Sequence, residues 1–69
     1  MKLGILTTRE KEIFELLILN KTTKDVTNIL NISEKTVRNH ISNVMQKLEV
    51  KTRYQAVIEL LKIGELKLN

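Results

Sequence analysis

The 69-residue sequence predicts an all-α domain of four helices. Apolar residues recur at intervals of three and four, which is the period of a helix with one buried face. A serine or threonine stands where each helical segment would begin, and such residues satisfy the free amides of a first turn. The period-two alternation of a half-buried strand is absent, and the β-branched residues follow helical spacing. Without a linker or repeat, residues 1–69 are expected to form a single domain.

The first two helices are expected over about residues 7–19 and 23–30. Each begins with a threonine that is followed three residues later by an acid, the spacing of a capping box. The pairs are Thr7 with Glu10 and Thr22 with Asp25. Asn20 and Asn31 follow the two segments, and asparagine tolerates the left-handed conformation in which many helices end. The inward residues are expected to be Ile13, Phe14, Leu16, Leu17, Ile18, Val26, Ile29 and Leu30.

The third helix, expected over residues 34–48, carries two different faces. Ser33 stands at its N-cap, where the hydroxyl can accept from the amide of Thr36. One apolar stripe contains Val37, Ile41, Val44 and Leu48. The opposite face is rich in donors suited to phosphates and base edges, namely Lys35, Arg38, Asn39, Ser42, Asn43, Gln46 and Lys47. A short helix, a tight turn and a polar-faced helix are the pattern of a DNA-reading helix-turn-helix.

The fourth helix is expected over residues 53–63, between Thr52 and Gly64, a favoured residue after a helix end. Its body, AVIELLKI, is too apolar for a helix with one buried face. We expect the surplus to form the seam of a two-fold dimer, a device that gives a small DNA reader a second half-site. The seam would contain Ile58, Leu61, Lys62, Ile63 and Leu66. The alternative is that these residues wrap the small core of one chain.

The charge composition of the sequence indicates which class of molecule the protein binds. Twelve Lys and Arg against eight Asp and Glu give a net charge of +4. Five bases and one acid lie between Lys35 and Arg53, so the positive charge is concentrated around the third helix. Such a surface favours polyanions. There is no cysteine and a single histidine, so no metal or other cofactor is expected.

Other function classes find little support in the sequence. No apolar run approaches the roughly 20 residues of a membrane span, and no signal peptide is indicated, so a cytoplasmic, nucleoid-associated protein without membrane or small-molecule partners is expected. No glycine-rich phosphate loop or nucleophile elbow supports an enzyme. His40 is expected to be a packing residue. Two functions stay open: a DNA-binding transcriptional regulator, and a small helical adaptor that docks on RNA polymerase or a sigma factor.

The segments LTTREKEIFELL, TTKDVTNILNIS, EKTVRNHISNVMQKLEV and KTRYQAVIELL resemble the LuxR-type helix-turn-helix family of bacterial regulators, over about residues 6–66. The specific part is three motifs in family order and spacing. They are T-x-R-E (Thr7, Arg9, Glu10), S-x-x-T-V-x-x-H (Ser33, Thr36, Val37, His40) and K-L (Lys47, Leu48). The resemblance is strongest to a single-domain regulator of sporulation. Many relatives instead attach this domain to a sensing domain, and Met1 favours a stand-alone regulator over a fragment.

The resemblance implies a four-helix LuxR-type fold, with the third helix as the recognition helix in the major groove and the fourth as the dimerisation helix of a two-fold homodimer on double-stranded DNA. By position, Arg38, Asn39 and Ser42 match residues that face bases. Thr22, Thr23, Lys24, Thr36 and Lys47 match residues that approach phosphates. The donor pattern itself adds Asn43 as a weaker base contact and Lys35 as a phosphate contact. Arg38 is the first choice for base reading, because arginine can donate two bonds to guanine.

Three positions depart from the family pattern. Asn20 and Glu49 stand where glycine is usual, and Thr27 replaces a small alanine between the second and third helices. Asparagine tolerates a left-handed conformation, whereas Glu49 leaves the exact turn after the third helix open. The hydroxyl of Thr27 needs a hydrogen-bond partner. None of the three lies on the expected reading face.

Overall fold

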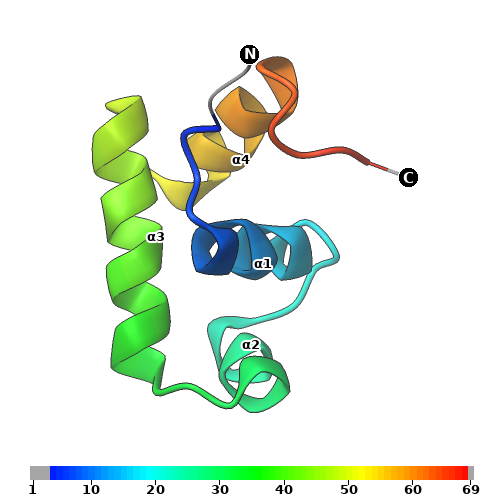
Figure 1. The fold of residues 1–69 in the computed structure, drawn as a ribbon, viewed down its shortest axis with the longest axis vertical. Helices are drawn as coiled ribbons and strands as arrows, with labels where there is room; N and C mark the ends of the chain where they lie inside the picture. Colours follow the sequence, from blue (N-terminus) through cyan, green and yellow to red (C-terminus); the bar gives the residue numbers. More distant parts are fainter. Residues whose placement is uncertain (1–3, 69) are drawn as a thin grey trace.

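The structure, a computed structural model, describes residues 4–68 and contains four α-helices and no strand in that range. They are α1 (Thr8–Leu17), α2 (Thr23–Leu30), α3 (Glu34–Leu48) and α4 (Arg53–Lys62). Figure 1 shows α3 along one side of the molecule, with α4, α1 and α2 arranged along its other side. α3 contacts all three other helices. The predicted all-α, four-helix fold is confirmed, and one long side of α3 faces no other helix.

The core lies between α3 and the helices packed on it. Its buried apolar residues are Ile13, Phe14, Val26, Val37, Ile41, Val44, Ala56, Leu60 and Leu66. Three of the four predicted stripe residues of α3 belong to this set, and Leu48 is half-buried against it. Because these residues recur at helical spacing, burying them turns the intervening polar residues of α3 away from the core. The core therefore decides which face of α3 is exposed.

All four helices begin as the caps predict. Thr7 and Thr22 form complete capping boxes with Glu10 and Asp25. The hydroxyls of Ser33 and Thr52 accept from the amides three residues later, at 3.1 and 3.0 Å. These bonds satisfy amides that a helix leaves free at its start. Each helix accordingly begins at the residue after its cap.

A left-handed residue follows each helix. The φ angles are 66° at Asn20, 56° at Asn31, 57° at Glu49 and 80° at Gly64. At each one the next amide bonds to a carbonyl five residues back, as in a Schellman motif. α1 ends at Leu17, earlier than the expected residue 19, because the amides of residues 19 and 20 bond to carbonyls three residues back and tighten the last turn.

The reversal after α4 corrects one prediction. Gly64 turns the chain so that the amides of Glu65 and Leu66 both donate to the carbonyl of Leu60, at 2.9 and 3.2 Å. This brings Leu66 back onto the core, where it is only 3% exposed. The prediction that Leu66 lies on the outer seam is therefore wrong. The sequence pattern shows that the tail is apolar, but only the turn at Gly64 decides which leucine faces inward.

Replacing Glu49 with glycine should stabilise the domain. Glu49 ends α3 in a left-handed conformation that its Cβ disfavours, and glycine adopts that conformation without this strain. We expect Glu49→Gly to raise the free energy of unfolding by about 0.5–1 kcal/mol, measured by urea denaturation. Glu49→Ala removes the same charge but keeps the Cβ. Equal stabilisation by both variants would show that charge, and not backbone strain, is responsible.

Candidate nucleic-acid interface

The side of α3 that faces no other helix carries the polar residues singled out in the sequence. Those that the structure leaves exposed are Lys35, Arg38, Asn39, Ser42, Asn43, Gln46 and Lys47. All four predicted base-contacting residues lie in this set. Thr36 is half-buried, and its hydroxyl lies 2.9 Å from that of Ser33. The structure thus brings the predicted donors together as one continuous helix face.

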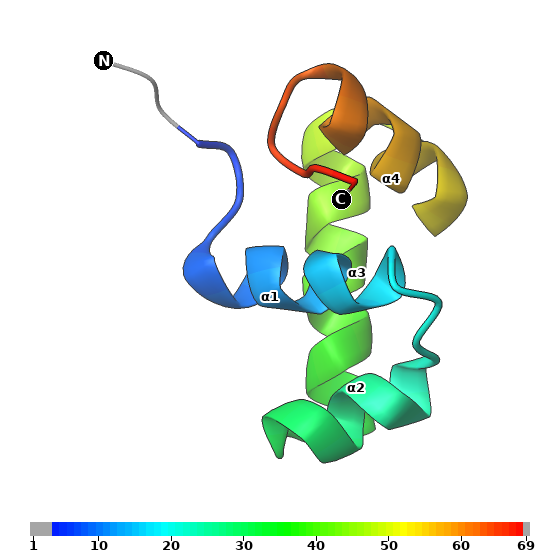
Figure 2. The ribbon, with the colours of Figure 1, turned by 90° about the vertical axis from the view of Figure 1, so that its right-hand side faces the viewer.

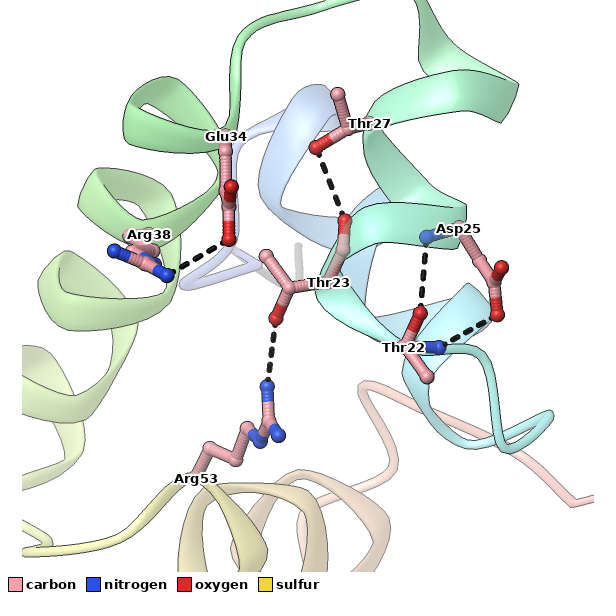
Figure 3. A network of polar contacts seen from close by, with 7 residues as sticks. All are labelled: Thr22, Thr23, Asp25, Thr27, Glu34, Arg38 and Arg53. Carbon is pink, nitrogen blue, oxygen red and sulfur yellow. Dashed lines mark hydrogen bonds and ion pairs between the residues drawn. The ribbon is translucent and has the colours of Figure 1, made fainter.

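Arg38 has a partner within the described part of the chain. Its Nη2 donates to Oε2 of Glu34 at 2.7 Å, one helical turn earlier (Figure 3). The arginine side chain is 71% exposed and that of the glutamate 51%. An ion pair this exposed contributes little to stability, because solvent screens both charges. Arg38 can therefore leave Glu34 for a ligand at small cost.

The N-terminal ends of α2 and α4 meet beside this face. Nη1 of Arg53 donates to Oγ1 of Thr23 at 3.1 Å, which joins residues 30 positions apart (Figure 3). A shallow hollow between the two ends and α3 is lined by Thr23, Arg38, Ile41, Ser42, Met45, Lys51, Thr52 and Arg53. Three of these side chains are cationic and none is acidic. Such a hollow is suited to a phosphate group.

Lys51 and Arg53 were not among the residues predicted to contact phosphate. The signal that could have found them is the run of five bases from Lys35 to Arg53, which includes both. Their position next to α2, however, follows only from the packing of α4 on α3. Spacing along one helix does not show it, because the two residues lie in the turn after α3 and the first turn of α4.

The first turn of α2 is less open to an anion than its threonines suggest. The amide of Thr22 donates to Oδ2 of Asp25, and the Asp25 amide donates to the Thr22 hydroxyl, both at 3.0 Å. Hydrogen bonds from the backbone and the side chain of Thr22 to the carboxylate lower the pKa of Asp25, with a smaller contribution from the charge of Lys21. An ionised carboxylate thus already occupies this helix end. Among the predicted phosphate-contacting residues here, Thr23 faces the hollow, and Lys24 is exposed.

Thr27 finds its hydrogen bond inside α2. Its Oγ1 donates to the carbonyl of Thr23 at 3.0 Å (Figure 3). The hydroxyl therefore needs no partner from α3. The substitution of threonine for the usual small residue is accommodated within one helix.

Lys47, predicted to contact phosphate, is bonded to its own chain. Its Nζ donates to the carbonyl of Ile5 at 2.9 Å and to Oε1 of Glu10 at 2.5 Å. Glu10 is only 3% exposed. Burial alone would raise the pKa of Glu10, but the hydrogen bonds from Lys47 and Thr7, with the charges of Lys47 and His40, lower it overall. A phosphate contact that drew Lys47 away from Glu10 would leave a buried carboxylate uncompensated.

The predicted seam on α4 is largely exposed. Ile58 and Ile63 are 42% and 44% exposed, and Lys62 lies on the surface near Glu59. Leu61 is half-buried against the core. Apolar side chains this exposed on one short helix are a feature of surfaces that pair with another molecule.

Residues 4–60 of the chain match the protein family described as bacterial regulatory proteins of the LuxR family. The chain belongs to the LuxR family. The match covers all of α1, α2 and α3 and most of α4. Members of this family are DNA-binding transcription regulators and not enzymes. The chain is accordingly a transcriptional regulator with a DNA-binding helix-turn-helix domain.

Several members of the LuxR family resemble the chain strongly. It is 67% identical to the spore germination protein GerE of Bacillus subtilis (strain 168) over 64 residues, which cover 93% of this chain and 86% of GerE. It is 46% identical over 65 residues to the transcriptional regulatory protein DegU of Brevibacillus brevis, covering 94% of this chain but 28% of DegU. A solved structure of the transcription factor GerE superposes with a TM-score of 0.93 at 58% identity, covering 97% of this chain and all of that one.

Other potential sites are not found in the described part of this LuxR-family chain. Residues 4–68 contain no group of three or more acidic, histidine or cysteine side chains that could hold a metal ion. Among the same residues, no helix is both long and apolar enough to cross a membrane.

Removing the Arg53 side chain should weaken binding of duplexes of every sequence to a similar extent. If the hollow holds a phosphate, one fewer neutralised phosphate should reduce the slope of log K against log salt by about 0.9. Fluorescence anisotropy with Arg53→Ala over a salt series measures this slope. Lys11→Ala, which removes an exposed cation on α1, is the matched control and should leave the slope unchanged. A loss of affinity that depends on sequence would contradict a phosphate role.

Proposed function

We propose that the chain is a sequence-specific transcriptional regulator that binds a roughly palindromic duplex as a two-fold dimer, with α3 in the major groove. The observation that supports it most is the exposed polar face of α3, flanked by the cationic hollow at the N-terminal ends of α2 and α4. A major groove is wide enough to admit a helix, and its base edges accept and donate hydrogen bonds. The flanking cations would then contact the adjacent backbone.

In this proposal the exposed face of α3 reads the bases. Arg38 leaves Glu34 and donates to O6 and N7 of a guanine, and Asn39 pairs with an adenine. Ser42 and Asn43 add weaker contacts farther along the helix. Phosphates are contacted by Thr23, Lys24, Lys35, Thr36, Lys51 and Arg53. Thr22 and Lys47 are omitted, because Thr22 forms the capping box of α2 with Asp25 and Lys47 neutralises the buried carboxylate of Glu10.

The dimer forms through α4 in this proposal. Ile58 and Ile63 supply its apolar centre, and Leu61 and Lys62 lie at its edge. A two-fold axis through α4 would place the two reading helices about one DNA turn apart, about 34 Å. A small domain also gains stability from such association. Since Leu66 is already buried in the core, it takes no part.

The proposed biological programme rests on a relative that is 67% identical to this chain. That relative is called a spore germination protein and shares most of its length with this chain. We therefore propose that the chain regulates genes of a bacterial spore programme, acting at the nucleoid in the cytoplasm. Expression profiling of a deletion strain through sporulation tests this role. Unchanged expression of spore genes would contradict it while leaving DNA binding untouched.

Selection from a randomised duplex library, followed by sequencing, tests the proposed function directly. The purified chain at near-physiological salt should recover a two-fold symmetric motif. Analytical ultracentrifugation with that motif should give two chains per duplex, and Ile58→Glu should reduce this to one. A stable monomer that retains all duplexes equally would overturn the proposal.

Arg38→Ala should remove one base preference. Loss of two bonds to a guanine costs about 1–3 kcal/mol, which corresponds to about 5- to 150-fold in affinity for the preferred duplex. Binding of a duplex already mutated at that base should change much less. Gln46→Ala, which shortens another exposed side chain of α3, is the control. Equal losses on both duplexes would show that Arg38 contacts phosphate.

A second candidate function is a helical adaptor that docks on RNA polymerase or a sigma factor. The exposed apolar residues of α4 favour it, because they suit a protein partner as well as a second copy. Ile58→Glu would then abolish regulation in cells, whereas Arg38→Ala would have no effect. The proposed DNA reader predicts that both variants lose regulation.

A further inference from the structure

An apolar groove lies between α1 and α2, on residues that the proposed DNA interface and the dimer seam do not use. It is lined by Glu12, Glu15, Leu16, Leu19, Ile29 and Leu30. Leu19 is 65% exposed, and Ile29 is 53% exposed, so the expectation that Ile29 faces inward is wrong. Large aliphatic side chains that are exposed side by side on two helices are characteristic of interaction surfaces.

The apolar surface continues beyond this groove toward the C-terminal tail. A second hollow is lined by Glu15, Ile18, Leu19, Lys67 and Leu68, and it shares Glu15 and Leu19 with the first. Leu68 is 70% exposed. The two hollows adjoin at Glu15 and Leu19, so that aliphatic side chains line a strip from the end of α2 across α1 to the tail, with Glu15 and Lys67 beside them. A strip of this form can accept an extended row of side chains.

The groove stays accessible when the other two surfaces are occupied. None of its lining residues belongs to α3 or α4. Figure 2 shows α1 and α2 in front of α3, and the groove is lined only by residues of α1, of α2 and of the turn between them. A molecule seated between α1 and α2 can therefore bind together with DNA on α3 and a second copy on α4.

The charge of the groove indicates what kind of molecule can bind in it. In a chain of net charge +4, the charged residues that line the groove are Glu12 and Glu15. Glu12 is paired with Arg9 at 3.1 Å, but both side chains are more than two-fifths exposed, so the pair is readily exchanged. These acids would repel DNA and favour cations at the edge of an apolar partner. A second copy related by a two-fold axis through the groove would oppose like charges.

We propose that the α1–α2 groove docks an amphipathic helix of another protein, whose apolar face is flanked by lysine or arginine. Apolar anchors at helical spacing would contact Leu16, Leu19 and Ile29, as in helix-in-groove recognition. The flanking cations would pair with Glu12 and Glu15. Together with the DNA-binding face, the groove would allow the domain to hold a protein beside its DNA site.

The test is a titration of the full chain, labelled with ¹⁵N, with a short synthetic amphipathic peptide that has leucines on one face and lysines at its flanks. Amide shifts should saturate at Leu16, Leu19 and Ile29 and be absent at Arg38 and Ile58. The same peptide with glutamate in place of lysine should bind at least about tenfold more weakly, because the like charges repel. A protein with Glu12→Gln and Glu15→Gln should lose most of this difference between the two peptides.

Variants separate this inference from the proposed DNA function. Leu19→Glu with Ile29→Glu should reduce peptide affinity about tenfold or more, since both apolar anchors are lost. Because both side chains are exposed, the helical circular dichroism and the DNA affinity should be retained. Tyr54→Glu, a change of an exposed side chain on α4, is the matched control and should leave peptide binding unaltered.

Three results would overturn the inference. The first is the absence of peptide-induced shifts in the groove, and the second is equal binding of the lysine and glutamate peptides. The third is shifts in the groove that depend on protein concentration without peptide, which would identify a second copy as the occupant. Each of these can occur while DNA binding is normal, so failure of the docking proposal is distinct from failure of the proposed function.

Discussion

Leu66→Ala is expected to lower the free energy of unfolding by about 3 kcal/mol, within the range for buried leucines truncated to alanine. Leu66 packs into the core after the reversal at Gly64, with its amide bonded to the carbonyl of Leu60. The loss combines the apolar contacts of the side chain with the cavity that remains. For a domain of this size such a loss removes a large part of the total stability.

Leu68→Ala provides the matched control, because Leu68 lies two residues farther along the same tail and is exposed. It should change the stability by less than about 0.5 kcal/mol, as surface substitutions usually do. Urea denaturation of both variants at several protein concentrations measures the difference. If the loss of stability in Leu66→Ala disappeared at high protein concentration, the leucine would lie in a dimer seam. That result would contradict its burial in one chain.

Lys47→Met is expected to cost about 3 kcal/mol of stability, because it leaves the buried carboxylate of Glu10 without its cation. Methionine retains the length and apolar stem of lysine, so the lost packing is small. Lys11→Met, an exposed site on α1, should have little effect. Thermal and urea denaturation measure the loss. If Lys47 contacted phosphate instead, Lys47→Met would weaken DNA binding and leave stability unchanged.

The pH dependence of stability gives a second readout for this pair. The pKa of Glu10 in the folded chain lies below its ordinary value of 4.5. The stabilisation is therefore fully present above about pH 4.5 and is lost as the pH falls through the lowered pKa. In Lys47→Met, burial is expected to dominate and to raise the pKa of Glu10. Acidification should therefore lower the free energy of unfolding of this variant less than that of the original chain. An unchanged pH profile would show that Lys47 does not stabilise the carboxylate.

The sequence was sufficient for features that depend on neighbouring residues. Thr7, Thr22 and Ser33 cap helices because each hydroxyl reaches an amide three residues away. Asn20 and Gly64 end helices because both tolerate a left-handed conformation. The apolar stripe of α3 fixed its exposed face through periodicity alone. These signals are local, and they agree with one another throughout the chain.

Features that depend on distant residues could not be predicted in the same way. Lys47 and Glu10 are 37 positions apart, and Arg53 and Thr23 are 30 apart. Each pair meets only after the helices have packed. The family pattern assigns a residue type to position 47, but it does not show whether the ammonium group points outward or toward Glu10. The hollow between α2, α3 and α4 is likewise a product of packing.

The pairing of Arg38 with Glu34 has a consequence for how the proposed regulator would search a chromosome. On DNA that lacks the right base, Arg38 finds no matched pair of acceptors if it leaves the carboxylate of Glu34. Glu34 itself repels nearby phosphates. Arg38 would then stay with Glu34, and the domain would be held less tightly at incorrect positions. At a matching guanine two acceptors compete with one carboxylate, and the exchange becomes favourable. The pair would therefore shorten the time spent at incorrect positions and leave the residence time at the operator long.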